Sequence, residues 1–394
     1  MSKKNKQLVH LLTEAGEALQ ADPTAIPWNI YPRPQMRRDS FLNLNGCWNF
    51  AVSFENKGLI RVPFCPESML SGIQAHFPEG SALCYSKNVT LPEGFNRGRV
   101  LLHIGAADQE LTCYVNQKQV GTHAGIDAMT FDITDALQET NELLIRVTDD
   151  LRNTAHPYGK QTLKRGGMWY TPVSGIWQTV WLESVPESYI RNLRIDNHGY
   201  AVTIDTGDTS LTGTVTVKDL GSFALKDGKV TIAPENPHLW SPEDPFLYEF
   251  TVETPTDRVE SYFAIRSLEI KTVDGTPRLC LNGKPYFFHG LLDQGYWPEG
   301  LLTAPAPESF ARDILAMKKL GFNTLRKHIK VEPEEFYYQC DKLGMIVWQD
   351  MVNNSDYNFL RDTALPTVGI QKLDDRKLHT DDNHRREFLR EAQA

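Results

Sequence analysis

The stretch from Phe322 to Met351, FNTLRKHIKVEPEEFYYQCDKLGMIVWQDM, most constrains the fold of this chain. Two short apolar runs, FNTL and MIVW, are typical of central strands in a parallel sheet. Between them, Glu332 and Pro333 open a segment with apolar residues at helical spacing, and Gly344 ends it. The order strand, helix, strand predicts parallel strands with a right-handed crossover, as in a doubly wound sheet or a (β/α) barrel.

The segment before this unit predicts another helix of the same kind. TAPAPESFARDILAMKKLG is amphipathic, with Pro307 near its first turn and Gly321 past its end. It follows the strand-like LCLNGKPYFFHG, so strands and helices alternate in the last part of the chain. No glycine-rich phosphate loop follows these strands, which argues against an α/β oxidoreductase that binds a dinucleotide.

Two β-rich regions come earlier, so the predicted fold class is multidomain β plus α/β. From about Phe41 to Val185, short strands alternate apolar and polar residues between turns, which is typical of a β-sandwich or jelly roll. The next region, to about Ile270, has the size of an immunoglobulin-like sandwich. The predicted units are a helical leader at 1–25, a jelly roll at 26–186, an immunoglobulin-like sandwich at 187–270 and part of a barrel at 271–394.

Composition excludes several classes of partner. The net charge of -9 comes from acids spread along the 394 residues, so nucleic acid is not an expected ligand. No apolar run approaches the ~20 residues of a spanning helix, and no secretory signal is visible, so no membrane partner is expected. Six cysteines without Cys-x-x-Cys spacing predict buried free thiols and a cytoplasmic setting, with zinc or disulfides as alternatives. No cofactor or metal is expected, and a homo-oligomer is compatible with the sequence.

Several short motifs, each weak alone, follow one another in a fixed order along the chain. In the first region they are LNGCW at 44–48, VPF at 62–64, MW at 168–169 and SGIW at 174–177. In the last region they are LNGKP at 281–285, LGFN at 320–323 with Arg326 after it, and CDKLGMIVWQD at 340–350.

With these motifs the chain resembles glycoside hydrolase family 2, which includes bacterial β-galactosidases and β-glucuronidases. The resemblance implies a jelly-roll sugar-binding domain, an immunoglobulin-like sandwich and a (β/α)8 catalytic barrel, in that order. It also implies a carbohydrate substrate and retaining hydrolysis of β-glycosides by two glutamates, an acid and a nucleophile ~5 Å apart. One departure is Gly167, which stands where better-known members carry an acidic residue before Met-Trp.

The two catalytic glutamates of the family lie past its third barrel strand. The resemblance therefore places both of them beyond Ala394, and we expect this chain alone to be inactive. An alternative is a non-catalytic carbohydrate-binding or scaffold protein derived from the family. The final segment predicts the start of a barrel helix, with Asp382 or Asn383 as its cap.

Polar and aromatic residues follow each of the three predicted barrel strands, where ligands bind in such folds. Their alternatives are ordinary loop, cap and core roles. Alternation puts Arg326 and His328 on one face of their strand and Lys327 on the other. The row of cations is consistent with an acidic sugar such as a uronide, and equally with solvated rim charges. The predicted substrate-binding residues are Asp293, Gln294, Tyr296, Trp297, Arg326, His328 and Asp350.

Three tryptophans of the first region, Trp48, Trp177 and Trp181, alternate with polar residues in strand-like segments. This spacing predicts that they lie in the core or at a domain interface.

Overall fold

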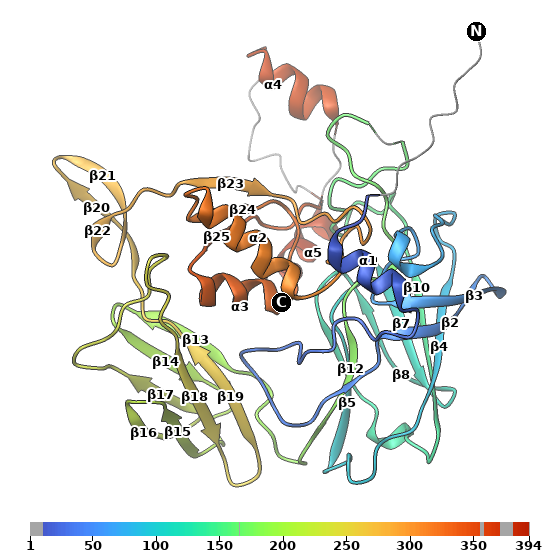
Figure 1. The fold of residues 1–394 in the computed structure, drawn as a ribbon, viewed down its shortest axis with the longest axis horizontal. Coiled ribbons are helices and arrows are strands. Elements are labelled where there is room, and N and C mark those ends of the chain that lie inside the picture. Colours follow the sequence, from blue (N-terminus) through green and yellow to red (C-terminus); the bar gives the residue numbers. More distant parts are fainter. Residues whose placement is uncertain (1–10, 165, 355–357, 371–380, 394) are drawn as a thin grey trace.

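The computed structural model of this chain describes residues 11–164, 166–354, 358–370 and 381–393. Two β-sandwiches and a small parallel sheet with helices follow one another along the chain (Figure 1). This confirms the predicted fold class of jelly roll, immunoglobulin-like sandwich and partial barrel.

The first sandwich packs a six-stranded sheet, in the order β3-β2-β4-β10-β7-β8, against a four-stranded sheet in the order β1-β12-β5-β9. Inward side chains alternate with accessible ones, as the burial pattern of β10 shows. Trp48, Tyr85 and Leu102 are buried in the core between the sheets. The elements are β1 (Leu42–Asn43), β2 (Gly46–Val52), β3 (Glu55–Val62), η1 (Met69–Ser71), β4 (Leu83–Val89), β5 (Arg99–Ile104), β6 (Ala107–Asp108), β7 (Glu110–Val115), β8 (Lys118–Ala124), β9 (Met129–Asp132), η2 (Thr134–Ala136), β10 (Asn141–Thr148), β11 (Gly175–Ile176) and β12 (Val180–Val185).

The second sandwich is smaller and entirely antiparallel. A three-stranded sheet, β13-β14-β17, packs on a four-stranded sheet, β16-β15-β18-β19, around buried residues such as Ile204, Val215 and Phe250. Its strands are β13 (Arg194–His198), β14 (Ala201–Asp205), β15 (Gly213–Val217), β16 (Gly221–Leu225), β17 (Lys229–Ile232), β18 (Tyr248–Glu253) and β19 (Arg258–Phe263).

The last part begins with an antiparallel sheet that projects from the body and continues into three parallel strands (Figure 1). The parallel order is β23-β24-β25, which confirms the predicted strand, helix, strand unit. Phe310 and Phe336 anchor the two helices on the core of this part. The elements are β20 (Leu268–Val273), β21 (Thr276–Leu281), β22 (Lys284–Pro285), β23 (Gly290–Asp293), α2 (Glu308–Lys319), β24 (Thr324–Lys327), α3 (Glu334–Leu343) and β25 (Ile346–Gln349).

The helix ends agree with the residues that predicted them. Pro307 is the N-cap of α2, and Gly344 caps α3 in the left-handed conformation with φ 77°. α1 (Glu14–Ala21) begins at Thr13, whose side chain accepts a hydrogen bond from Gly16 N. The region after β25 holds a π-helix, η3 (Leu360–Ala364), which continues into α4 (Leu365–Thr367).

The last helix, α5 (Asp382–Gln393), is present, but the predicted cap is wrong. Asp381 Oδ1 accepts hydrogen bonds from the backbone of Asn383 and His384, so the cap lies one residue earlier. α5 also contacts the first sandwich, where Arg390 Nη1 lies 3.1 Å from Asp127 Oδ1.

Two strands of the six-stranded sheet, β3 and β4, carry a weaker strand pattern in the sequence than β10 does. β4 has the alternation of a strand only in its first half, where Leu83 and Tyr85 are buried. β3 is mostly exposed along its length. Both therefore show less of the period-2 pattern on which strand prediction depends.

Candidate functional site

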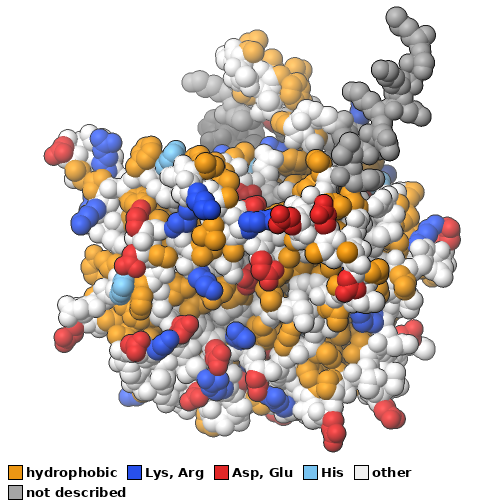
Figure 2. All heavy atoms as spheres, viewed as in Figure 1, with side chains coloured by type: hydrophobic (Ala, Val, Ile, Leu, Met, Phe, Trp, Pro, Cys, Tyr) orange, Lys and Arg blue, Asp and Glu red, His pale blue; other side chains and the backbone are white. Residues whose placement is uncertain are grey.

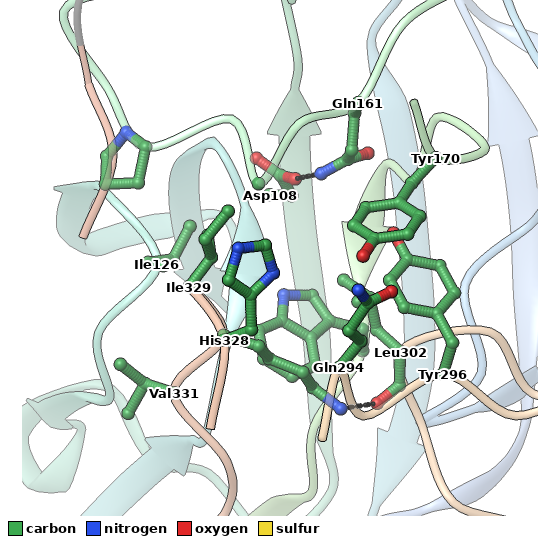
Figure 3. Close-up of a pocket in the computed structure, with 14 residues that line it drawn as sticks. Asp108, Ile126, Gln161, Tyr170, Gln294, Tyr296, Leu302, His328, Ile329 and Val331 are labelled. Atoms are coloured by element: carbon green, nitrogen blue, oxygen red, sulfur yellow. Dashed lines mark hydrogen bonds between the residues drawn. The ribbon is translucent and has the colours of Figure 1, made fainter. Parts of the chain in front are cut away.

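A pocket lies where the first sandwich meets the carboxyl ends of the parallel strands (Figure 3). The space between its side chains, including the part open to solvent, is about 520 Å³. Loops after β23 and β24 supply Gln294, Tyr296 and His328 to one side. Ligands bind at this end of parallel strands and in clefts between domains, so this pocket is the candidate functional site. The first sandwich contributes Asp108, Gln161, Tyr170 and Trp177.

The SGIW motif builds the pocket wall on the side of the first sandwich. β11 pairs with β6, so Gly175 lies opposite Asp108. Gly175 has φ +74°, and a Cβ at this position would come within 2.1 Å of Tyr85 Oη, so only glycine fits without displacement. Ile176 is fully buried, and Trp177 lines the pocket at 3% exposure. The motif therefore places an aromatic side chain beside a carboxyl.

Asp108 is the carboxyl of the pocket and is 2% exposed. Its Oδ2 accepts a hydrogen bond of 3.2 Å from Gln161 Nε2, and Gln161 Oε1 accepts one from Val173 N. Its Oδ1 is buried and has no hydrogen-bond partner among the described residues. Burial raises the pKa of Asp108 to about 7, although the bond from Gln161 opposes the shift.

Tyr296 and His328 form the opposite wall. The ring of Tyr296 stacks on Tyr170 of the first sandwich, with centroids 4.6 Å apart. His328 Nε2 lies 3.5 Å from Lys160 Nζ. Burial, together with the charge of Lys160, lowers the pKa of His328, so its neutral form is favoured at pH 7.

Four buried polar atoms in this pocket have no hydrogen-bond partner among the described residues. They are Asp108 Oδ1, Trp177 Nε1, Tyr296 Oη and His328 Nδ1. Each such atom costs roughly 1–3 kcal/mol if it stays unsatisfied, and native proteins keep few of them. A ligand with several hydroxyl groups would satisfy an acceptor and three polar ring groups at once. The pocket thus has the polar pattern of a binding site.

Two lysines are bound to carboxylates here, Lys327 beside the pocket and Lys330 in its lining. Lys327, 1% exposed, donates to Asp293 Oδ2 at 2.8 Å and to Glu332 Oε1 at 2.7 Å. Burial opposes its charge, but the Glu332 and Asp293 carboxylates outweigh burial and raise its pKa. Lys330 donates to the carbonyls of Gly295 and Leu302 and lies 2.8 Å from Glu332 Oε2. Asp293 and Glu332 therefore neutralise two of the cations that follow β24.

Three of the seven predicted substrate-binding residues line the pocket, namely Gln294, Tyr296 and His328. Asp293 is bound to Lys327. Trp297 is 9% exposed and packs in the hydrophobic core of the barrel part, with its ring centroid 6.2 Å from that of Phe310. The role of these residues in binding sugar stays a prediction.

The other two predicted residues, Arg326 and Asp350, contact each other. Arg326 Nε and Nη2 donate to the two carboxylate oxygens of Asp350 at 2.9 and 3.1 Å. The Arg326 side chain is 56% exposed, while Lys327 is buried, as the predicted alternation requires. This ion pair lies outside the lining of the pocket, and its contact with a sugar stays a prediction.

Eleven of the 14 lining residues were not predicted as site residues, among them Asp108, Gln161, Tyr170 and Trp177 of the first sandwich. Trp177 was predicted to lie in a core or interface and does so, as do Trp48 and Trp181, at 1% and 2% exposure. One signal for Asp108 is present in the sequence, since a carboxyl follows the apolar run VLLHIGAA directly. Such a carboxyl is either paired or functional when it is buried.

A metal centre is not found in the described ranges. No group of three or more His, Cys, Asp or Glu side chains within them is placed to hold a metal ion. Within the same ranges, no helix is long and apolar enough to cross a membrane.

Comparison with known proteins gives concordant matches. The family model described as glycosyl hydrolases family 2 matches residues 189–266. A putative β-glucuronidase of Formosa agariphila is 22% identical over 367 residues, which cover 83% of this chain, and a β-galactosidase of Thermoanaerobacter pseudethanolicus is 25% identical over 68% of it. The solved β-glucuronidase of Faecalibacterium prausnitzii matches with a TM-score of 0.65 over 81% of the chain at 23% identity.

The matched region is only part of each relative. The chain spans 43% of the Formosa protein, 39% of the Thermoanaerobacter protein and 60% of the Faecalibacterium chain. The family model, the relatives and the order of jelly roll, sandwich and parallel sheet agree with the motif order in the sequence. Residues 189–266 match the family 2 model, and the chain as a whole is similar to proteins named β-glucuronidase and β-galactosidase.

Proposed function

We propose that this protein acts in the hydrolysis of β-glycosides and that the pocket between the first sandwich and the parallel strands holds the sugar. The four unpaired polar atoms of the pocket carry this proposal. Trp177 Nε1 and Tyr296 Oη donate to sugar oxygens, and Asp108 Oδ1 accepts from a hydroxyl. Relatives named β-glucuronidase and β-galactosidase support the reaction class.

Retaining hydrolysis needs two carboxylates ~5 Å apart, an acid and a nucleophile. Of the 14 residues that line the pocket, only Asp108 carries a carboxyl group, and it is held by Gln161. The pocket lining thus provides binding and orientation, and the pair of catalytic carboxylates comes from residues outside this lining. We assign to this chain the placement of the sugar ring, which lowers the entropic part of the barrier.

The same observation favours a second candidate, a protein that binds carbohydrate without cleaving it. A lining with one carboxyl suffices for recognition, which uses a few placed polar groups and aromatic walls. The two candidates differ in turnover and agree in binding.

Both candidates are tested on the purified 394-residue chain with ligand-observed NMR and with 4-nitrophenyl β-glycosides. We expect methyl β-glycosides to bind and Tyr296→Phe to weaken binding about fivefold, as loss of one hydrogen bond of about 1 kcal/mol requires. Tyr286→Phe is the matched control, because Tyr286 Oη donates to Glu243 away from the pocket. We expect it to leave the affinity unchanged.

The outcomes distinguish binding from turnover on this chain. Binding together with release of nitrophenol supports the hydrolase with this chain alone, and binding without release leaves cleavage to other residues or to none. Lack of binding to any glycoside contradicts the proposed site.

A further inference from the structure

The cations that follow β24 are not free to bind an anionic ligand. Lys327 and Lys330 share Glu332, and Lys327 also binds Asp293, so two lysines face two carboxylates. The Lys330 ammonium is further taken up by the carbonyl oxygens of Gly295 and Leu302. An ammonium has three N–H donors, and Gly295 O, Leu302 O and Glu332 Oε2 together can accept from all three.

Arg326 is occupied as well. Its guanidinium makes a two-point contact with the Asp350 carboxylate, the geometry in which arginine binds carboxylates most strongly. A uronate would have to displace Asp350 to use this cation. The sequence from Arg326 to Lys330 contains one arginine and two lysines, but each is paired with a carboxylate, so a ligand meets less positive charge than the sequence suggests.

Lys330 and Asp108 are the two charged residues of the pocket lining, and the Lys330 ammonium is already bound to Glu332 and to two carbonyl oxygens. Asp108 Oδ1 is unpaired and the side chain is nine-tenths buried or more, at 2% exposure. Figure 3 shows this carboxyl at the edge of the space that His328 and Tyr296 border from the other side. A second carboxylate placed beside it would be destabilised, because like charges interact strongly where water is excluded. A hydroxyl in the same place donates a hydrogen bond to Oδ1.

Among the described residues, Lys160 is a further cation near this space, and it lies outside the pocket lining. Its ammonium lies 3.5 Å from His328 Nε2. On the face drawn in Figure 2, acidic and basic side chains are interspersed rather than gathered by sign. That face therefore offers no cluster of one sign that would steer a charged ligand.

We propose that the pocket accepts an uncharged pyranose and rejects uronates, and that Asp108 is the group that discriminates. This inference rests on the proposed function, because it names the class of sugar for the same pocket. Asp108 acts as a specificity-determining residue that hydrogen-bonds a hydroxyl of the ring.

The test compares four ligands on the purified chain at pH 8 by ligand-observed NMR and calorimetry. They are methyl β-glucopyranoside, methyl β-galactopyranoside and the two corresponding methyl uronides. We expect at least one neutral glycoside to bind at least tenfold more tightly than its uronide. A uronide that binds as well as its neutral counterpart overturns the inference and leaves the sugar site standing. If none of the four binds, the proposed function fails with it.

A substitution assigns the selectivity to one residue. Asp108→Asn keeps the shape and removes the charge, and we expect it to reduce the ratio of affinities to within about threefold. Glu335→Gln is the matched control, because Glu335 is a buried carboxyl on α3 whose pKa burial also raises, and it does not line the pocket. An unchanged ratio in Asp108→Asn contradicts the role of Asp108. The ratio of affinities for the neutral glycoside and the uronide is measured on the wild-type chain. Selectivity is therefore tested even if Asp108→Asn does not fold.

Discussion

Tyr170 of the first sandwich and Tyr296 of the barrel part stack their rings with centroids 4.6 Å apart and planes inclined by 30°. The two residues are 126 positions apart in the chain and both line the pocket. The stack therefore joins the two walls of the site, and the shape of the pocket depends on it.

We predict that this stack couples the two walls energetically. Tyr170→Ala and Tyr296→Ala should each lower the free energy of unfolding, and a double-mutant cycle should give a coupling of about 0.5–1.5 kcal/mol beyond burial. Urea unfolding followed by tryptophan fluorescence measures it. A coupling of zero would mean that the rings only lie near each other.

A second prediction concerns Gly175, where the backbone conformation and the close approach act together. Gly175→Ala should destabilise the chain by more than about 2 kcal/mol, because φ +74° strains any other residue and the new Cβ meets Tyr85 Oη at 2.1 Å. Gly207→Ala is the matched control, since φ is +70° there and no atom lies within 4 Å of the Cβ position.

Gly207→Ala separates the cost of backbone strain at positive φ from the cost of a steric clash of the new Cβ. Gly207→Ala should cost about 1 kcal/mol for the backbone conformation alone. Adding Tyr85→Phe to Gly175→Ala should recover part of the loss, because it removes the oxygen that the Cβ meets. Equal effects of the two glycine substitutions in denaturant titrations would refute the collision.

Local sequence rules predicted the elements that depend on local signals. α3 ends at Gly344 because glycine takes the left-handed conformation at a helix end at little cost. β24 and β25 were predicted because continuous apolar runs are typical of strands covered on both faces. The chain order of these elements also predicted that the strands are parallel.

The pocket was predicted only on its barrel side, and the reason is physical. Gln294, Tyr296 and His328 follow strands, so topology alone places them at one edge of the sheet. Asp108 and Gln161 are brought together by antiparallel pairing and a long loop, and no periodicity in the sequence encodes that contact. Likewise, the charges of Lys327 and Lys330 were visible, but the partners that neutralise them were not.

A third prediction follows from the ion network around Lys330. Lys330→Met leaves Glu332 with one cation instead of two and removes the hydrogen bonds to the carbonyl oxygens of Gly295 and Leu302. We expect a loss of about 3–5 kcal/mol in unfolding free energy, the usual cost of breaking a buried pair on one side. Lys319→Met, at an exposed position at the end of α2, should change stability by less than about 0.5 kcal/mol. Chemical denaturation of both variants compares them, and similar values would show that the network contributes little.

The last prediction concerns Asp149, a buried carboxyl outside the pocket. Burial, and next the charge of Asp108, raise the pKa of Asp149 to about 9, far above the ordinary value of 3.8. Between these two pH values the folded chain holds a proton at Asp149 that the unfolded chain has lost. This contribution to stability is therefore largest at low pH and falls as pH rises, by at most about 1.4 kcal/mol per pH unit.

Asp149→Asn has the same shape and no proton to lose, so its free energy of unfolding should fall less between pH 5.5 and 8.5 than that of the wild type. Asp150→Asn is the neighbouring control. Hydrogen bonding to Arg152 lowers the pKa of Asp150, so Asp150 is ionised in both the folded and the unfolded chain throughout this range. Its substitution should shift stability by the same amount at every pH. Urea titrations at four pH values measure the three slopes, and parallel slopes for Asp149→Asn and the wild type would show that Asp149 titrates like an exposed carboxyl.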